Sequence, residues 1–295
     1  MFQHPQSGTT TLAQWCDMHE ELIRSRPLKP RTINDRLNNL RHLRNALGSR
    51  LLCHITPRDL ELLINTITRS GRPFTARRVY IEANELFNAA VYCRLIPNNP
   101  LSPIKMPTPR PARARLSLQH FLKIREVAES MTRPWFASCL NLALVTGQRR
   151  ADVAAMAPTQ VFANHLHVIQ QKCGARVAIP LELKLDAIGI SVRESIDRCL
   201  EIRPGSRTFV ARRDGQPYVT AMLTHTFAAC RDKAFPRQTW RSPPTFHEIR
   251  SLSERLYRSQ GINTQILLGH KHARMTDLYN DERDLEGDAF KYVSL

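Results

Sequence analysis

Six side chains in the second half of the chain could together cleave a phosphodiester bond without a metal ion. Two are arginines, whose planar guanidinium groups match pairs of phosphoryl oxygens. One is a tyrosine that could act as the nucleophile, and the others could move protons. In chain order they are Arg149, Lys172, His247, Arg250, His270 and Tyr279.

This chemistry makes specific demands on the residues. Without Mg²⁺, arginines are the best stabilisers of phosphoryl charge, and one preorganised donor is worth roughly 3–4 kcal/mol at the transition state. A free tyrosine, with a pKa near 10, is only about one part in a thousand ionised at neutral pH, so cations or a base must assist it. A lysine or histidine must then protonate the leaving alkoxide.

Each of these signals has a simpler structural explanation when it is taken alone. An arginine after Thr-Gly is usually a surface residue, a lysine in a hairpin is usually solvated, and a tyrosine near a C-terminus usually packs on the core. The HEIR sequence resembles a zinc-protease motif, but Ser251 stands where the second histidine would be needed. The acidic segment 280–288 is better explained as a solvated tail than as a cation site. We therefore expect no metal, and without a P-loop or GxGxxG motif we expect no nucleotide cofactor.

Composition favours a polyanionic partner. The 295 residues include 43 Lys and Arg against 26 Asp and Glu, a formal net charge of +17, which indicates binding to nucleic acid or an acidic surface. The seven cysteines are widely spaced without a CxxC pair, which is typical of a reducing compartment. No secretory signal and no long apolar segment is evident, so a cytoplasmic location without membrane insertion is expected.

The first third of the chain is predicted to be helical. After a short extension (1–9), residues 10–96 contain four segments with helical periodicity, beginning at Thr or Pro and ending near Gly48 and Gly71. The first segment is predicted to bury Leu12, Trp15, Leu22 and Ile23. Basic residues on the outer faces are candidate DNA contacts: Lys29, Arg31, Arg36, Arg77 and Arg78.

A proline-rich basic segment, residues 97–116, is predicted to be an extended linker. Its basic residues, with Lys105 and Arg113 as the chosen candidates, are expected to lie along a polyanion, although a merely soluble linker is the alternative. From Ser117 to the end the pattern is mixed. Helices alternate with one β-hairpin that turns at Cys173-Gly174. The predicted fold class is mainly α with a small antiparallel sheet.

Taken in order, the motifs resemble those of the tyrosine recombinases, and within them the lambda-type phage integrases. The resemblance rests on VTGQRRADV, QQKCGARVAIP, PPTFHEIRSLSERLY, LLGHK and the downstream Tyr279. It covers residues 115–295 nearly end to end and extends more weakly through the helical region. It implies a helical core-binding (SAM-like) domain over 10–96 and a catalytic domain over 117–295 that together clamp duplex DNA.

The resemblance also implies a role for each residue. Tyr279 would attack the scissile phosphate and form a 3′-phosphotyrosyl link, while Arg149 and Arg250 would clamp the non-bridging oxygens. Lys172 would protonate the leaving 5′-oxygen. His247 would assist proton transfer, His270 would hydrogen-bond the phosphate from a position exposed after Gly269, and Asp152 would support the site.

The implied partners are double-stranded attachment sites, a homotetramer acting through a Holliday junction, and accessory DNA-bending and excision proteins. The tail after Tyr279 would pack on a neighbouring subunit. About ten residues precede the first helix, so the arm-binding domain of lambda-type integrases is expected to be absent. Two alternatives remain: a truncated or non-catalytic DNA-binding prophage remnant, and a type IB topoisomerase, which acts as a monomer.

Overall fold

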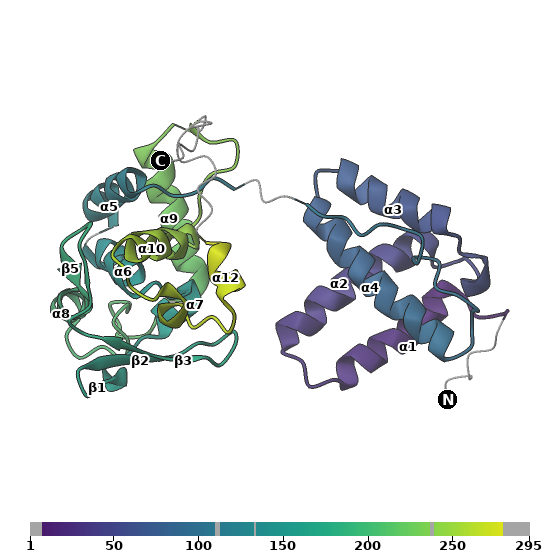
Figure 1. Ribbon diagram of the computed structural model, residues 1–295, viewed down its shortest axis with the longest axis horizontal. Coiled ribbons are helices and arrows are strands. Elements are labelled where there is room, and N and C mark those ends of the chain that lie inside the picture. The colour runs from purple at the N-terminus through teal and green to yellow at the C-terminus, as the bar shows by residue number, and fades with distance from the viewer. Residues whose placement is uncertain (1–7, 110–112, 133, 237–238, 280–295) are drawn as a thin grey trace, which may run out of the picture. The chain divides into compact units, whose positions relative to one another are not determined.

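The computed structural model describes residues 8–109, 113–132, 134–236 and 239–279. The chain folds into two compact units, residues 1–111 and 112–295 (Figure 1). None of the helices among the described residues is long and apolar enough to cross a membrane. The tail that was expected to pack on a neighbouring subunit, residues 280–295, lies outside the described part of the chain.

The first unit is built from helices that begin where the sequence supplies caps. Thr11 and Thr56 each accept a hydrogen bond from the third residue of the following helix, whose side chain bonds back to the cap. Proline occupies the start of each of the other two long helices. The elements are α1 (Leu12–Ser25), α2 (Pro30–Leu47), η1 (Leu52–His54), α3 (Pro57–Arg69) and α4 (Pro73–Tyr92).

One predicted core residue of the first helix is wrong. Leu12, Trp15 and Ile23 are buried, but Leu22 is 45% exposed. The buried face of this helix is centred on Leu12, His19 and Ile23, and at about 100° per residue Leu22 lies at the edge of that face. The core instead takes Cys16 and His19 from this helix.

A buried charged cluster joins α1, α2 and α4. Glu82 is 3% exposed, and it accepts from Arg36 Nη2 at 2.7 Å and contacts His19 Nε2 at 3.2 Å. Although burial raises the pKa of Glu82, the bonds from His19 and Arg36 outweigh it and hold that pKa below its ordinary value. Arg36 also pairs with Glu85 at 2.7 Å, so its charge serves the fold of this unit.

The expected linker is shorter than the proline content suggested. Leu101 is fully buried in the core of the first unit, and Ile104 packs against the same core. Tyr80 donates to the carbonyl of Ile104 at 2.8 Å. At the other end, Ala114 and Leu116 are buried in the second unit. Proline density correctly excluded helix here, but it does not exclude a segment that packs on its neighbours.

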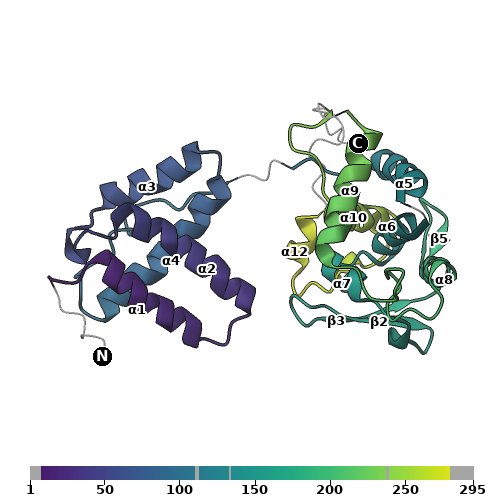
Figure 2. The same ribbon diagram turned by 180° about the vertical axis from the view of Figure 1, so that it is seen from behind.

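The second unit is mainly helical, with small antiparallel sheets, which confirms the predicted fold class (Figure 2). Its helices are α5 (Leu118–Thr132), α6 (Pro134–Thr146), α7 (Arg150–Ala155), η2 (Pro158–Gln160), α8 (Val192–Ile202), α9 (Thr220–Ala234), α10 (Glu248–Ser259), α11 (Thr264–Leu267) and α12 (Ala273–Asp277). Its strands are β1 (Val161–Phe162), β2 (His165–Ile169), β3 (Arg176–Pro180), β4 (Lys184–Leu185) and β5 (Ile190–Ser191).

The predicted hairpin is β2–β3, which pairs in register from His165 with Pro180 to Ile169 with Arg176. Strand β1 extends this sheet, and β4–β5 form a separate pair that the sequence patterns did not indicate. Helix α6 is buried along almost its whole length, as its run of apolar residues demands. It packs against α5, α8 and α10 and ends at Thr146, and the positive φ of Gly147 then turns the chain into the following loop.

Candidate active site

Arg250 lies at the centre of the candidate site and is 1% exposed. It projects from α10 and donates through Nη1 to the carbonyl of Gly147 at 2.8 Å and through Nη2 to the carbonyl of Leu268 at 2.6 Å. These two loops come from distant parts of the chain, so the guanidinium joins them. Among the described residues its buried Nε has no hydrogen-bond partner, so one donor of the guanidinium is unsatisfied in this arrangement.

His270 is buried beside Arg250 with 6% exposure, so the expectation that Gly269 exposes it was wrong. Its Nε2 lies 2.9 Å from Arg250 Nη2, and its Nδ1 lies 2.8 Å from Thr276 Oγ1. Arginine can only donate, so Nε2 must accept and Nδ1 must carry the proton that is donated to Thr276. The positive φ of Gly269 turns the chain back into the core here.

Tyr279 lies against three of the other candidates. Its hydroxyl is 3.4 Å from His247 Nε2, and its ring is stacked on that of His270 with centroids 5.3 Å apart. The Arg250 guanidinium carbon lies 5.5 Å from the Tyr279 ring centroid. His247 is the N-cap of α10 and is exposed. The hydroxyl therefore has both a proton acceptor and a cation close by.

Arg149 approaches the site from the start of α7, where it is the N-cap residue. Its Nη1 donates to Gln170 Oε1. Gln170 is fully buried, and its amide donates to Gln148 Oε1 at 2.8 Å and to the carbonyl of Leu268 at 2.9 Å. Arg149 and Arg250 are thus tied to one hydrogen-bonded network through Leu268.

Asp152 supports the hairpin, and among the described residues it forms no ion pair with Arg149 or Arg250, although its charge acts on Arg250. It is 3% exposed, and its Oδ1 accepts from the backbone N–H of Gln171 at 2.8 Å. Lys172 follows directly in the turn between β2 and β3, and its side chain is exposed. Cys173, also in this turn, donates through Sγ to Gln170 Oε1 at 3.1 Å.

The electrostatics of the site keep both histidines neutral. Although His247 as a whole residue is exposed, partial desolvation of its imidazole, followed by the charges of Arg250, Arg149, Arg113 and Lys172, lowers its pKa below the ordinary value. Burial, followed by the charges of Arg250 and Arg149, lowers the pKa of His270 to about 4. Burial and the charge of Arg149 lower the pKa of Arg250 to about 10, so this guanidinium is still charged at neutral pH.

The structure therefore brings together most of the predicted catalytic side chains. Arg250, His270, His247 and Tyr279 touch one another, and Arg149 joins them through Gln170. Lys172 makes no direct contact with them among the described residues, but its charge acts on His247. The arrangement can bind an anion, accept the tyrosine proton and stabilise the charge that develops in phosphoryl transfer.

The candidate DNA contacts of the first unit differ in availability. Arg31 and Arg78 are exposed on α2 and α4, and Lys29 is the exposed N-cap residue of α2. Arg36 is held by Glu82 and Glu85, and Arg77 lies 3.5 Å from the carbonyl of Pro107.

In the predicted linker, Lys105 and Arg113 are exposed. Arg115 is instead 5% exposed and paired with Glu248, so the expectation that this part of the linker lies along a polyanion fails at that residue.

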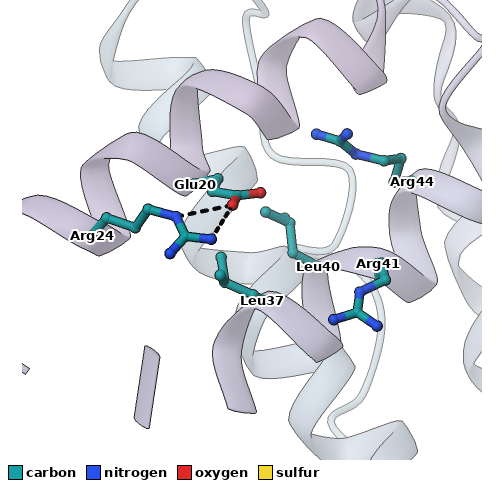
Figure 3. A pocket seen from close by; sticks show the side chains of 6 residues that line it. All are labelled: Glu20, Arg24, Leu37, Leu40, Arg41 and Arg44. Carbon is teal, nitrogen blue, oxygen red and sulfur yellow. Dashed lines mark hydrogen bonds and ion pairs between the residues drawn. The ribbon is translucent and has the colours of Figure 1, made fainter. Parts of the chain in front are cut away.

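A hollow of about 240 Å³ on the first unit is separate from these residues. It is lined by residues of α1 and α2, and at its edge Arg24 donates to Glu20, one turn away on α1, at 2.6 Å (Figure 3). The lining residues are Glu20, Arg24, Leu37, Leu40, Arg41 and Arg44. None of the candidate catalytic residues contributes to it.

Sequence reasoning missed the residues that orient the candidates. Gln148, Gln170 and Thr276 bear ordinary amide or hydroxyl groups, and each is 2% exposed or less. Their proximity to Arg149, Lys172 and Tyr279 in the sequence was the only available signal. Gln148 and Gln170 bond to the carbonyls of Leu267 and Leu268, and Thr276 bonds to the ring of His270. No local sequence pattern specifies these partners.

Comparison with known proteins identifies the family. Residues 115–286 match the Phage integrase family. The chain is 36% identical over 288 residues to the prophage integrase IntE of Escherichia coli K12, covering 92% of this chain and 76% of that protein. It is 33% identical over 283 residues to the integrase of Escherichia phage lambda, covering 95% and 79%.

Solved structures agree with these matches. A lambda integrase dimer bound to a COC′ core site superimposes with a TM-score of 0.89 at 33% identity, covering 96% of this chain and 80% of that one. A lambda integrase tetramer bound to a Holliday junction gives a TM-score of 0.90 at 32% identity, covering 97% and 82%. The similarity thus covers both units, in sequence as well as in structure. The chain belongs to the phage integrase family.

Proposed function

We propose that this protein is a site-specific DNA recombinase that cleaves and rejoins DNA through a 3′-phosphotyrosyl intermediate. The observation that carries the proposal is the position of Tyr279, whose hydroxyl is 3.4 Å from a neutral His247 and whose ring lies over the charged Arg250. A phenol needs both a proton acceptor and a nearby cation to attack a phosphate at neutral pH.

In the proposed reaction, the Tyr279 oxygen attacks phosphorus and the bond to the 5′-oxygen breaks. His247 Nε2 takes the phenolic proton, and Lys172 supplies the proton that the 5′-oxygen requires. Arg149 and Arg250 bind the non-bridging oxygens, where charge builds up. His270 and Asp152 act indirectly, the former on Arg250 and the latter on the hairpin that carries Lys172.

The second step reverses the first with a different 5′-hydroxyl. That hydroxyl attacks the phosphotyrosine, a new phosphodiester forms, and Tyr279 leaves. The energy of the broken bond is conserved in the protein–DNA link, so ATP is not needed. Two such exchanges would pass through a Holliday junction within a homotetramer, as the lambda relative bound to such a junction suggests.

The proposed substrate is duplex DNA at an attachment site, gripped by both units. The net charge of +17 supports this substrate. In the first unit, Lys29, Arg31 and Arg78 are the best placed candidates for phosphate or base contacts, because their side chains are exposed. Since the substrate is DNA, we propose that the protein acts in the cytoplasm of a bacterial host, at the nucleoid.

A covalent-adduct assay tests the proposal. Binding sites are first selected from a randomised duplex pool and then built into nicked duplexes from which the cleaved end diffuses away. Wild-type protein in EDTA should give an adduct that survives denaturation, and Tyr279→Phe should give none. Tight DNA binding without any adduct would favour the non-catalytic prophage remnant.

A second arm addresses topoisomerase activity. Relaxation of a supercoiled plasmid that carries a single site would indicate a type IB topoisomerase. The proposed recombinase should instead require two sites and accumulate a four-way junction when the second exchange is blocked.

A further inference from the structure

Arg115 forms a buried junction between three segments of the second unit. Its guanidinium is 5% exposed. Nη1 donates to Glu248 Oε2 at 2.9 Å and to Ser251 Oγ at 2.7 Å, and Nη2 donates to the carbonyl of Leu278 at 2.5 Å. Charge-assisted bonds of this kind are among the strongest and most directional in proteins.

The partners of Arg115 adjoin the residues assigned to proton transfer and attack. Glu248 directly follows His247, and Leu278 directly precedes Tyr279. One rigid guanidinium therefore fixes the peptide of the nucleophile relative to the helix that carries its proton acceptor and Arg250. Helix α12 is only five residues long, so its own hydrogen bonds hold this segment weakly.

Burial protects the hydrogen bonds of Arg115 from competition with water. Glu248 is 5% exposed and Ser251 is 1% exposed, so water cannot replace the guanidinium without reorganising the site. Leu278, by contrast, has a side chain that is 70% exposed. Its side chain therefore anchors the segment poorly, and the bond from Arg115 to its carbonyl supplies the anchor instead.

Arg255 offers a matched comparison. Its Nη2 donates to the carbonyl of Leu116 at 2.6 Å, so it secures the same stretch of chain that carries Arg115. Loss of Arg255 removes this bond to Leu116 and leaves Arg115 itself, with its partners Glu248, Ser251 and Leu278, unchanged.

We propose that Arg115 is a positioning residue that holds Tyr279 within reach of its proton acceptor and of the scissile phosphate. This inference rests on the proposed role of Tyr279 as the nucleophile. It assigns to Arg115 no contact with DNA. Its effect is on the rate of attack, because a displacement of about 1 Å in a reacting group can slow a reaction about 10²-fold.

The test compares wild type, Arg115→Met, Arg115→Lys and Arg255→Met, with Lys172→Ala as the control for loss of the proton donor. Each protein is assayed for DNA affinity, thermal unfolding and the rate of adduct formation on the nicked duplex. A parallel duplex carries sulfur in place of the scissile 5′-oxygen, because a thiolate leaves without a proton. Hydrogen exchange is measured in the peptide covering residues 273–279.

The expected result is that Arg115→Met binds DNA normally but forms the adduct about 10²-fold more slowly. The sulfur substrate should rescue Lys172→Ala but not Arg115→Met, since a better leaving group cannot return a misplaced nucleophile. Exchange in residues 273–279 should rise in Arg115→Met and not in Arg255→Met. Arg115→Lys should be intermediate, because an ammonium keeps the charge but lacks the fork.

Three outcomes would overturn the inference. They are adduct formation by Arg115→Met at the wild-type rate, equal slowing in Arg255→Met, and rescue of Arg115→Met by the sulfur substrate. Should Arg115→Met fail to fold, Arg115→Lys decides, and a wild-type rate in that variant counts against the proposal. Failure of wild type to form any adduct is a separate result, which removes the proposed function and this inference together.

Discussion

Arg250 donates to His270 across 2.9 Å, and this single bond determines what the histidine can do. Because Nε2 accepts from a guanidinium, it cannot at the same time donate to a phosphate oxygen. In this arrangement His270 is bonded to Arg250, and the direct contact with the phosphate that the family resemblance implies stays a prediction. The proton on Nδ1 is held by Thr276, which extends the same chain of bonds into α12.

Loss of Arg149 and loss of Arg250 should differ in their effect on the stability of the second unit. Arg149→Ala removes a transition-state contact, so we expect adduct formation to fall by about 3–4 kcal/mol in activation free energy. DNA affinity and unfolding should stay close to wild type, because among the described residues the Arg149 guanidinium bonds to the side chains of Gln170 and Cys173. Single-turnover kinetics and denaturant unfolding measure both quantities. Cleavage at the wild-type rate would remove Arg149 from the site.

Arg250→Ala should slow adduct formation by a similar amount and should also lower the free energy of unfolding of the second unit. It removes the Arg250 donor from the carbonyl of Gly147, whereas the carbonyl of Leu268 keeps its bond from Gln170. A buried group left unpaired costs about 1–3 kcal/mol. Arg150→Ala, on the adjacent helix α7, is the matched control and should retain activity. Equal stability of Arg149→Ala and Arg250→Ala would contradict this division.

Thr276→Val should weaken the site although no predicted catalytic residue is changed. Valine has nearly the shape of threonine but cannot accept the Nδ1 proton of His270, which leaves a buried donor unpaired. We expect the free energy of unfolding to fall by about 1–3 kcal/mol and adduct formation to slow. Thr276→Ser keeps the hydroxyl and should restore activity. If the valine and serine variants behave alike, the hydroxyl has no role.

The stability of the second unit should depend on pH through His270. Its pKa is lowered from 6.5 to about 4 in the folded state, so the unfolded chain binds more protons between these values. This contribution is therefore fully present above pH 6.5 and is lost as the pH falls toward 4. For a group this buried the loss is as much as roughly 3 kcal/mol.

Denaturant unfolding at several pH values, compared with His270→Gln, isolates this term. The variant has no imidazole to protonate at this position, so its stability should fall less over the same range. Parallel curves for wild type and variant would show that His270 titrates normally.

Gly269→Ala should damage the site more than its backbone strain alone explains. A Cβ there would lie 2.8 Å from Gln170 Nε2 and 3.0 Å from Val177 Cγ2, which forces the glutamine that holds Arg149 to move. Gly261→Ala is the control, since Gly261 also has a positive φ but nothing within 4 Å of its Cβ. Both should lose about 1–2 kcal/mol through strain, and only Gly269→Ala should slow the adduct. Equal activity would exclude Gln170 as the support of Arg149.

Substitution of Arg78 should affect DNA binding, whereas substitution of Arg36 should affect the stability of the first unit. Arg78 is exposed on α4, and Arg78→Ala should reduce the salt dependence of DNA binding by about one unit of slope if it contacts a phosphate. Arg36→Ala should leave the slope unchanged and lower the melting temperature, because it leaves the negative charge of the buried Glu82 without its guanidinium partner. Binding isotherms over a series of salt concentrations measure the slope. An unchanged slope in Arg78→Ala with a reduced slope in Arg36→Ala would contradict the prediction.

Much of the architecture follows from local signals in the sequence. Thr11 and Thr56 mark helix starts because a hydroxyl can cap the first free N–H groups. The alternation on either side of Cys173 and Gly174 predicts the hairpin because side chains of a strand point to opposite faces. The order and types of Arg149, Arg250 and Tyr279 are equally visible in the sequence, since each supplies a functional group that the proposed chemistry needs.

The tertiary structure alone decides how those groups act. Whether Leu22 or Ile23 enters the core depends on the orientation of the helix, which the packing of the whole unit determines. Arg115 reads as a linker cation, but it is buried because Glu248, Ser251 and the Leu278 carbonyl converge on it from distant positions. The protonated nitrogen of His270 is likewise set by partners that lie 6 and 20 residues away. Residue types record which chemistry is available, whereas burial and long-range hydrogen bonds determine its geometry and its pKa values.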